Sequence, residues 1–406
     1  DNFVTTCKNF AQELRGSMTE QFKRLGVWMD WEDPYQTLKL SYIEAAWWTL
    51  AKAYDKNLLV SDSRVLTWCP RCETALAEAE YWDEKDPSVM VEFPLTEGEG
   101  SLLIWTTTPW TLPSNMAVAA HPDFDYAKIR MKDKDLEGLG YLPPFDIDDR
   151  YRRKTEWRHR VVLADYVEKD NTGLVHTAPG FGPDDYETGK RYGLDPFCPV
   201  NEAGRFTEAF PLLAGKKVKT TDQDILKHLE EKGILFASEK TQHRYGHCWR
   251  CKSPIIYRNT KQWFLKVTDI KDKMLAEVDR VKWVPEWAGT SRERNWVEGA
   301  RDWCVSRQRY WGIPMPVWTC PCGEKRVVGT YDELREGDGY TEGMDTHRPW
   351  IDGVTFECPR CGGEMHRVQD VLDVWFDSGV AGWADLGWPS DKEQFEKWWP
   401  ARFIVE

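Results

Sequence analysis

The sequence predicts an α/β protein whose helical first segment is followed by a β-rich insertion. In residues 3–24, apolar side chains recur at spacings of three and four, which is the pattern of an amphipathic helix. Residues 89–130 instead carry short strand-like runs broken by proline and glycine. Helical and strand signals then alternate along the rest of the 406 residues, so we expect two or three domains of mixed α/β structure.

The individual elements follow from the same two periodicities. Helices are predicted at residues 3–24, 41–54, 184–192, 222–232, 268–283 and 290–300, and Gly26 and Gly233 end two of them. Strands are predicted at residues 60–68, 161–163, 174–177 and 371–379. Residues 131–155, rich in glycine, proline and aspartate, indicate a surface loop or an insertion. The apolar run 403–406 predicts a buried strand, so we expect the chain to be a fragment of a longer protein.

Composition and charge restrict location and partners. The net charge of −13 opposes non-specific nucleic-acid binding by the whole surface. Contacts with RNA would therefore use local basic patches, such as residues 150–154 or 292–309, with plain solvated surface as the alternative for both. No apolar run approaches the roughly 18 residues of a membrane span, and the N-terminus resembles no signal peptide. We therefore expect a cytoplasmic protein without membrane contact.

Eight of the 11 cysteines form close pairs, namely Cys69/Cys72, Cys248/Cys251, Cys320/Cys322 and Cys358/Cys361. Two such knuckles together can supply the four thiolates of a tetrahedral structural zinc site. The last two pairs are close in sequence and predict one zinc ion. The first two pairs are separated by a whole domain, so a zinc ion there would staple the base of an insertion, with buried thiols as the alternative. The remaining Cys7, Cys198 and Cys304 are expected to pack in the core.

The segment 104–115, IWTTTPWTLPSN, predicts a rigid loop lined by hydroxyl groups at the end of a strand. Thr106, Thr107 and Thr108 alternate faces along the strand, so at least one hydroxyl points off the sheet edge. Pro109 and Pro113 force the chain out of the sheet, and Asn115 follows. A threonine-rich edge strand with a turn is the alternative interpretation.

A second segment, 173–187, reads GLVHTAPGFGPDDYE and could complete the same site. A strand brings His176 to its end, a tight turn follows, and Asp184 and Asp185 lie at a helix start. Only one aspartate can be the N-cap, so the other is free to face a ligand. With the threonines, the segment predicts a site containing hydroxyl groups, an imidazole and a carboxylate that could hold an ammonium group near an ester. A core histidine and two capping aspartates are the alternative.

Several long motifs, in order, resemble the isoleucyl-tRNA synthetases, a family of class I aminoacyl-tRNA synthetases. The resemblance covers nearly the whole chain and rests on FKRLGVWMDW (22–31), WCPRCETALAEAE (68–80), WTTTPWTLPSN (105–115), GLVHTAPGFGPDDY (173–186), HCWRCKSPIIYR (247–258), RDWCVSRQRYWGIPMPVW (301–318) and DVLDVWFDSG (370–379). The dipeptide that usually follows the threonines in valyl and leucyl relatives, Arg-Pro, is absent here, which favours isoleucine. The paired cysteines at 320–361 resemble the archaeal and eukaryotic-like branch.

The resemblance implies a partial Rossmann-type catalytic domain split by a β-rich editing insertion, with two zinc-knuckle modules. Its segments would be residues 1–68 before the insertion, the editing insertion 69–262, and the return 263–406 with a zinc module at about 318–368. Thr106, Thr107, Thr108, Asn115, His176 and Asp185 would line the editing pocket. Asp185 would bind the α-ammonium group of a misattached valine, and Thr107 and His176 would orient the terminal adenosine and water. Phe181 stands where many bacterial members have a second histidine.

The resemblance also implies ATP-dependent charging of tRNA(Ile) with isoleucine by an intact, monomeric enzyme that uses ATP, Mg²⁺ and two structural Zn²⁺ ions. Neither the HIGH nor the KMSKS motif of that reaction occurs in these residues, so we expect editing hydrolysis of Val-tRNA(Ile) without adenylate formation. Trp375 would belong to the isoleucine pocket, with a core tryptophan beside Phe376 as the alternative. Arg307 and Arg309 would touch the acceptor end or pair with acids.

Three other interpretations are compatible with parts of the sequence. A valyl- or leucyl-tRNA synthetase relative would share most of the motifs. A non-catalytic zinc-ribbon module that binds RNA would explain the cysteines and basic patches, but it leaves the threonines, His176 and Asp185 without a role. A free-standing editing hydrolase would not need the motifs after residue 263.

Overall fold

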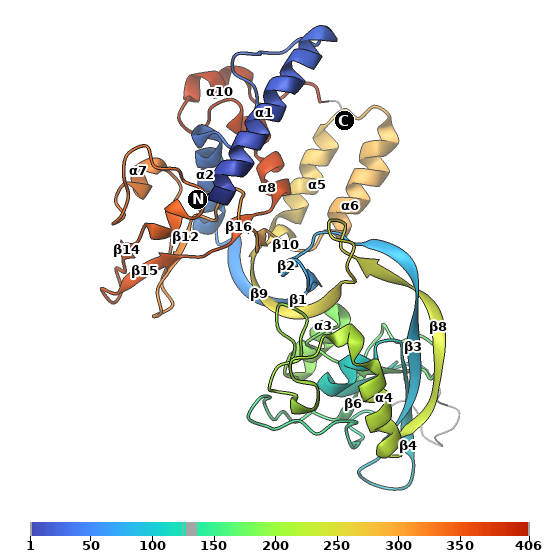
Figure 1. Cartoon of the computed structure of the whole chain (residues 1–406). Coiled ribbons are helices and arrows are strands. Elements are labelled where there is room, and N and C mark those ends of the chain that lie inside the picture. Colours follow the sequence, from blue (N-terminus) through green and yellow to red (C-terminus); the bar gives the residue numbers. More distant parts are fainter. Residues whose placement is uncertain (1, 125, 127–135, 405–406) are drawn as a thin grey trace. The chain divides into compact units, whose positions relative to one another are not determined.

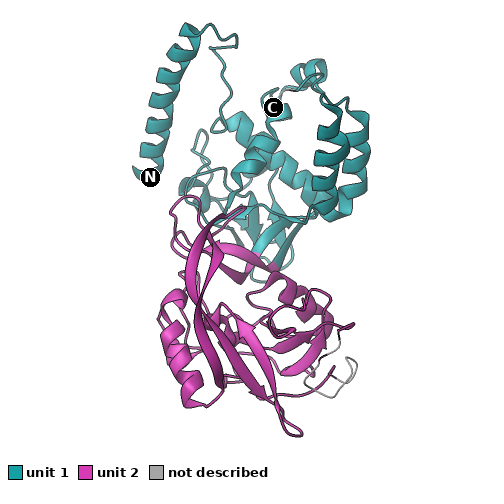
Figure 2. Ribbon diagram, turned by 90° about the vertical axis from the view of Figure 1, so that its right-hand side faces the viewer, with its two compact units in different colours: residues 1–62, 262–406 teal, residues 63–261 magenta. Residues whose placement is uncertain are grey.

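The computed structural model describes residues 2–124, 126 and 136–404 (Figure 1). The chain forms two compact units, which Figure 2 distinguishes by colour. Unit 1 contains Asp1–Asp62 and Gln262–Glu406, and unit 2 contains Ser63–Lys261. The chain enters unit 2 along β1 (Leu59–Cys69) and leaves it along β9 (Ile256–Leu265). Among the described residues, no helix is both long and apolar enough to cross a lipid bilayer.

Unit 1 begins with two helices whose apolar faces have different environments. Helix α1 (Asn2–Arg24) buries only Val4 among its described residues, and its stripe from Phe3 to Phe22 is largely exposed. Helix α2 (Leu40–Asp55) buries Ile43, Trp47 and Leu50, whose spacing of three and four places them on one face. The indole N–H of Trp47 donates to the Pro314 carbonyl at 2.8 Å, so α2 packs into the core of this unit.

The rest of unit 1 consists of short elements around the same core. In chain order these are η5 (Val267–Ile270), α5 (Lys271–Arg280), the π-helical turn η6 (Ala288–Glu293), α6 (Arg294–Gly299), β10 (Trp303–Cys304), β11 (Ser306–Arg307), β12 (Val317–Thr319), β13 (Lys325–Val327), α7 (Tyr331–Leu334), η7 (Trp350–Gly353), β14 (Phe356–Glu357), β15 (Glu364–Arg367), β16 (Val371–Leu372), α8 (Val374–Gly379), α9 (Ala381–Ala384) and α10 (Lys392–Trp398). One antiparallel sheet has the order β13-β12-β15-β14, and β11 pairs with β16.

Unit 2 contains two three-stranded sheets and carries the candidate site. Its elements are β2 (Thr74–Ala75), β3 (Glu80–Pro94), β4 (Ser101–Thr106), η1 (Pro109–Ser114), β5 (Ala117–Ala120), β6 (Arg160–Leu163), β7 (Leu174–Thr177), α3 (Pro183–Tyr192), η3 (Pro211–Leu213), η4 (Val218–Thr220), α4 (Asp222–Glu231) and β8 (Leu235–His247). The sheet orders are β4-β3-β8 and β6-β5-β7. Strands β3 and β8 form a long antiparallel ribbon from Glu80↔His247 to Val91↔Leu235 (Figure 1).

The mixed α/β content is confirmed, and so are most of the predicted elements, to within a few residues. Two local predictions are wrong. Residues 371–379 do not continue as one strand, because the Asp373 carboxylate accepts a hydrogen bond from the Trp375 N–H and starts helix α8. The expected buried strand at 403–406 is not found in its described part, since Phe403 and Ile404 are 84% and 79% exposed.

Residues 131–155 were expected to form a surface loop or an insertion, and their described part has no helix or strand. Residues 131–135 lie outside the described part of the chain. The described remainder reaches the hydrophobic core of unit 2, where Leu136, Tyr141, Phe145 and Ile147 are buried. Glycine and proline indicate loop geometry but not burial, because single apolar side chains between them can still anchor a loop to the core.

Candidate functional site

A cavity of about 370 Å³ lies within unit 2 and is lined by both sequence segments that predicted a site. Its polar lining comes from Thr106, Thr108, Thr111, His176 and Asp185. Its apolar lining includes Trp105, Trp110, Val175, Phe181 and Ile255. The sheets bring the segments together, because β4 delivers the threonines and β7, which pairs with β5, delivers His176.

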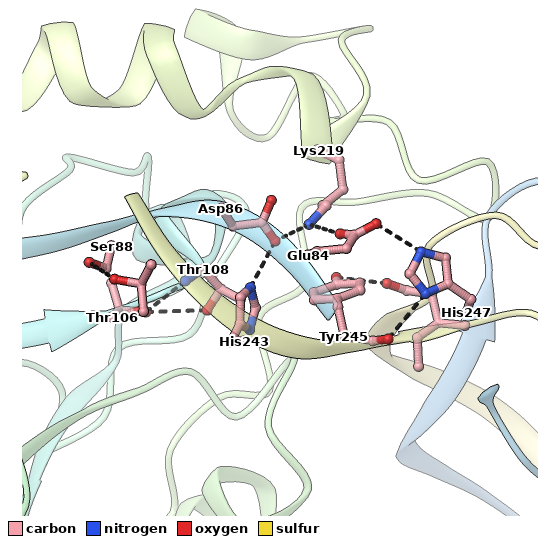
Figure 3. Close-up of polar contacts among 11 residues, drawn as sticks. Glu84, Asp86, Ser88, Thr106, Thr108, Lys219, His243, Tyr245 and His247 are labelled. Atoms are coloured by element: carbon pink, nitrogen blue, oxygen red, sulfur yellow. Dashed lines mark hydrogen bonds and ion pairs between the residues drawn. The ribbon is translucent and has the colours of Figure 1, made fainter. Parts of the chain in front are cut away.

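The threonine hydroxyl groups form a short row at the end of β4. The Oγ1 atoms of Thr106 and Thr108 are 3.2 Å apart, and the Thr108 N–H donates to Thr106 Oγ1 at 3.1 Å (Figure 3). Pro109 then starts the 3₁₀ helix η1, because its fixed φ suits a first helical position and it has no N–H to continue the sheet. This helix places Thr111, whose hydroxyl donates to the Thr108 carbonyl oxygen at 2.9 Å.

His176 is buried, and both of its ring nitrogens have protein partners. Nδ1 lies 2.9 Å from Asn115 Nδ2, and Nε2 lies 3.2 Å from Thr111 Oγ1. Burial lowers the pKa of His176 to about 4, because the apolar surroundings penalise the charged imidazolium. The imidazole is therefore neutral at physiological pH.

Asp185 supplies a buried carboxyl group to the cavity. Its Oδ2 accepts a hydrogen bond from the Ala178 N–H at 2.8 Å, and its Oδ1 accepts one from the Tyr166 hydroxyl at 3.1 Å. Burial raises the pKa of Asp185 to about 6, although these two hydrogen bonds oppose the shift. The backbone beside it must be glycine, since a Cβ atom on Gly182 would lie 2.5 Å from Asp185 Oδ2.

The structure corrects three expectations about this site. Thr107 and Asn115 are not among the described residues that line the cavity. Thr107 lies in a bend just after β4 ends, and Asn115 contacts Nδ1 of the His176 ring. Neither Asp184 nor Asp185 is the N-cap of α3, because Gly182 takes that position and Pro183 follows it at the first helical position.

Sequence reasoning missed the residues that β3, β8 and β9 contribute to the cavity. Tyr81, Arg244 and Tyr257 line it, and all three are exposed to solvent. The guanidinium of Arg244 donates to the Tyr81 carbonyl oxygen at 3.2 Å. Strand β8 carries charged residues on both faces, so its sequence contains no alternating apolar pattern that could have revealed it.

An ionic cluster lies on the β3–β8 ribbon (Figure 3). Lys219 bridges Glu84 and Asp86, His243 Nε2 is 3.0 Å from Asp86, and His247 Nε2 is 2.8 Å from Glu84. Partly buried pairs of this kind hold the two strands in register. We assign this cluster a structural role in the ribbon that carries Arg244.

The predicted cysteine groupings are confirmed as two clusters of four side chains. Cys69, Cys72, Cys248 and Cys251 form one cluster in unit 2, and Cys320, Cys322, Cys358 and Cys361 form the other in unit 1. Within each cluster all four sulfur atoms lie within 4.8 Å of one another, and none of the chain's cysteines forms a disulfide. Each grouping could therefore hold a metal ion.

The geometry of both clusters fits tetrahedral zinc. The Sγ–Sγ separations are 3.5 Å for Cys69–Cys251 and 3.4 Å for Cys320–Cys361. Tetrahedral zinc with Zn–S bonds of about 2.3 Å requires sulfur atoms about 3.8 Å apart, so small adjustments would suffice. In each knuckle, the residue after the second cysteine has a positive φ, which turns the backbone around the thiolates; these residues are Glu73, Lys252, Gly323 and Gly362.

The site residues predicted in unit 1 do not line this cavity, which belongs to unit 2. Trp375 lies on α8 and is 66% exposed, so the alternative of a core tryptophan is wrong. Arg307 is buried and pairs with Asp373 at 2.6 Å, which agrees with pairing to an acid. In the basic segment 150–154 of unit 2, Arg150, Arg153 and Lys154 pair with acids, with Arg150 2.7 Å from Asp148.

Comparison with known proteins now identifies the class. Residues 1–406 match the family described as tRNA synthetases class I (I, L, M and V). The chain belongs to this family, which confirms the resemblance seen in its motifs.

Several curated proteins similar to this chain are named isoleucine–tRNA ligase. The protein of Methanothermobacter thermautotrophicus is 54% identical over 438 residues, covering 100% of this chain and 42% of that protein. Those of Archaeoglobus fulgidus and Methanosarcina barkeri are each 50% identical, covering 100% of this chain and 43% and 42% of those proteins. The chain thus spans less than half the length of these relatives.

Proposed function

We propose that the chain is part of an isoleucine–tRNA ligase, in which unit 2 is the editing domain that hydrolyses valine wrongly esterified to tRNA(Ile). The identity of 50–54% to isoleucine–tRNA ligases over the whole chain supports the ligase. In that enzyme, isoleucine, ATP with Mg²⁺ and tRNA(Ile) are the substrates. We place the enzyme in the cytoplasm as a monomer, and Trp375 in its isoleucine pocket.

Physical chemistry explains why such an enzyme needs a second site. Isoleucine against valine is the standard example of limited discrimination, because one methylene in an apolar pocket is worth only about 1–3 kcal/mol. A site that admits valine and excludes the larger isoleucine can remove the errors that remain.

One observation carries the editing proposal. A single cavity in unit 2 combines a buried carboxyl, a row of hydroxyl groups and a neutral imidazole. The Asp185 carboxylate would bind the α-ammonium group of the aminoacyl ester, since a buried carboxylate gains most from an opposite charge. Thr106 and Thr108 would offer hydroxyl groups to the terminal ribose and to the attacking water, while the apolar lining would receive the side chain.

The two cysteine clusters would each hold one structural Zn²⁺ ion. All four ligand positions are thiolates of the protein, so neither ion would retain an open position for substrate. The ions would supply folding free energy rather than chemistry, and no step of hydrolysis involves them.

Deacylation by the 406-residue chain tests the proposal. Val-tRNA(Ile) and Ile-tRNA(Ile) carrying labelled amino acids are incubated separately with the chain, and ester loss is measured. We expect hydrolysis of the valyl ester, slower hydrolysis of the isoleucyl ester, and no ATP–pyrophosphate exchange. Asp185→Asn should lose the valine preference, whereas the matched variant Asp184→Asn should keep it. Equal rates with both esters, or an unchanged preference in Asp185→Asn, would contradict the proposal.

A further inference from the structure

A chain of buried hydrogen bonds leads from the described part of the 131–155 segment to the cavity. The Tyr141 hydroxyl lies 2.5 Å from Asn115 Oδ1, and Asn115 Nδ2 lies 2.9 Å from His176 Nδ1. His176 Nε2 lies 3.2 Å from Thr111 Oγ1, which lines the cavity. Tyr141 itself is 1% exposed and stacks on Phe93, with 5.3 Å between the ring centroids.

The Ala117 carbonyl oxygen and the Tyr141 hydroxyl together orient the Asn115 amide. Asn115 Nδ2 is also 2.9 Å from the Ala117 carbonyl oxygen, which can only accept a hydrogen bond. The amide nitrogen faces this carbonyl oxygen and donates its second hydrogen to His176 Nδ1. The amide oxygen then faces Tyr141, whose hydroxyl donates to it. Burial raises the pKa of Tyr141 well above its usual value, which keeps this donor protonated.

The contacts at the other end of this row of hydrogen bonds agree with the same direction. The Thr111 hydroxyl donates its one hydrogen to the Thr108 carbonyl oxygen, again a pure acceptor. In this arrangement Thr111 Oγ1 accepts from His176 Nε2, which then carries the proton. Both ends of this row of hydrogen bonds therefore agree with one imidazole tautomer, in which Nδ1 is unprotonated and Nε2 is protonated.

We propose that Tyr141 is a positioning residue of this site, which acts through Asn115 to hold His176 in the Nε2–H tautomer. In this state neither ring nitrogen has a free lone pair, so His176 takes no proton from water. It serves instead as a fixed donor that holds Thr111 and, through it, the hydroxyl row. The consequence for hydrolysis rests on the proposed editing function, whereas the tautomer does not.

The tautomer can be measured without any activity. The full chain is labelled with ¹⁵N-histidine, and two-bond ¹H–¹⁵N correlation spectra are recorded, with His176→Asn used to assign the signal. We expect an unprotonated Nδ1 and a protonated Nε2 between pH 6 and pH 8. A protonated Nδ1 in the wild-type chain would overturn the proposal.

Two variants test the role of this row of hydrogen bonds. Asn115→Asp places an acceptor opposite Nδ1, so the proton should move to Nδ1. Tyr141→Phe removes only the first donor, so the two nitrogen shifts should move toward a mixture of tautomers, and deacylation of Val-tRNA(Ile) should slow roughly tenfold, as expected for one lost hydrogen bond. Tyr126→Phe is the matched control, because the Tyr126 hydroxyl donates to the Gly173 carbonyl oxygen and does not belong to the hydrogen bonds that lead to His176.

The outcomes separate the two proposals. Unchanged ¹⁵N shifts in Tyr141→Phe, or equal effects of Tyr141→Phe and Tyr126→Phe, would refute the positioning role. A wild-type chain that shows the Nε2–H tautomer but does not hydrolyse Val-tRNA(Ile) would refute the editing function and leave the tautomer assignment standing.

Discussion

The protonation of Asp185 predicts how deacylation depends on pH. Burial raises the pKa of this carboxyl from 3.8 to about 6, so ionising it costs about 3 kcal/mol more than in water. A bound α-ammonium group offsets that cost, and only the carboxylate form can bind it. With a pKa of about 6, the carboxylate fraction is about one half at pH 6, about one tenth at pH 5 and about one hundredth at pH 4.

The substrate sets the opposite limb of the profile. An α-amino group loses its proton near pH 8, and the neutral amine no longer pairs with Asp185. The kcat/KM for Val-tRNA(Ile) should therefore be bell-shaped, with its maximum near pH 7 and a fall of about tenfold per pH unit below 6 and above 8. Rates are measured with labelled Val-tRNA(Ile), after subtraction of the spontaneous ester hydrolysis of tRNA alone.

Two variants make the origin of the acid limb clear. Asp185→Asn should give a low rate without the acid limb, because no carboxyl remains to titrate in the cavity. Asp184→Asn changes the neighbouring carboxyl in the first turn of the same helix and should keep the bell. An acid limb near pH 4 in the wild type, or an unchanged limb in Asp185→Asn, would refute the reasoning.

Three further predictions follow from contacts elsewhere in the chain. Metal analysis should find about two zinc ions per chain, about one in Cys248→Ser and still about two in Cys198→Ser; a wild-type value of one would remove a site. Gly182→Ala should lower the free energy of unfolding by about 1–3 kcal/mol in urea titrations and abolish valine-specific deacylation, because its Cβ would displace the Asp185 carboxyl; unaltered kinetics would contradict this. Arg307→Ala should cost about 3–5 kcal/mol of stability, since it leaves a buried carboxylate unpaired, and a loss below about 1 kcal/mol would instead indicate a pair of surface character.

The sequence predicted those elements whose apolar residues follow one periodicity. Helix α2 is the clearest case, because Ile43, Trp47 and Leu50 lie on one face and all of them are buried. The β3–β8 ribbon could not be predicted in full, because its central stretch carries Glu84, Asp86 and other charges where an alternating apolar pattern would be needed. Its pairing depends on contacts between residues far apart in sequence.

Of the candidate site, the sequence predicted several residues that line the cavity, but not all of those that support them from behind. Thr106, Thr108, His176 and Asp185 belong to compact motifs, so sequence could nominate them, and the cavity brings them together. Tyr141 could not be nominated, because it lies in a loop of turn-forming residues and reaches Asn115 only through the tertiary fold. The tautomer of His176 likewise depends on contacts that Asn115 makes with Tyr141 and Ala117, and it leaves no trace in the local sequence.

The cysteine cluster of unit 2 also closes a very long loop. Cys69 and Cys251 are 182 residues apart in sequence, yet their sulfur atoms are 3.5 Å apart. In the chain-entropy description, a permanent link across such a loop lowers the conformational entropy of the unfolded state. The loss raises the free energy of the unfolded state by about 5 kcal/mol. A metal ion at this point would therefore act on the unfolded ensemble as much as on the folded unit, and chelation would lower the stability of unit 2 by enlarging the entropy of its unfolded state.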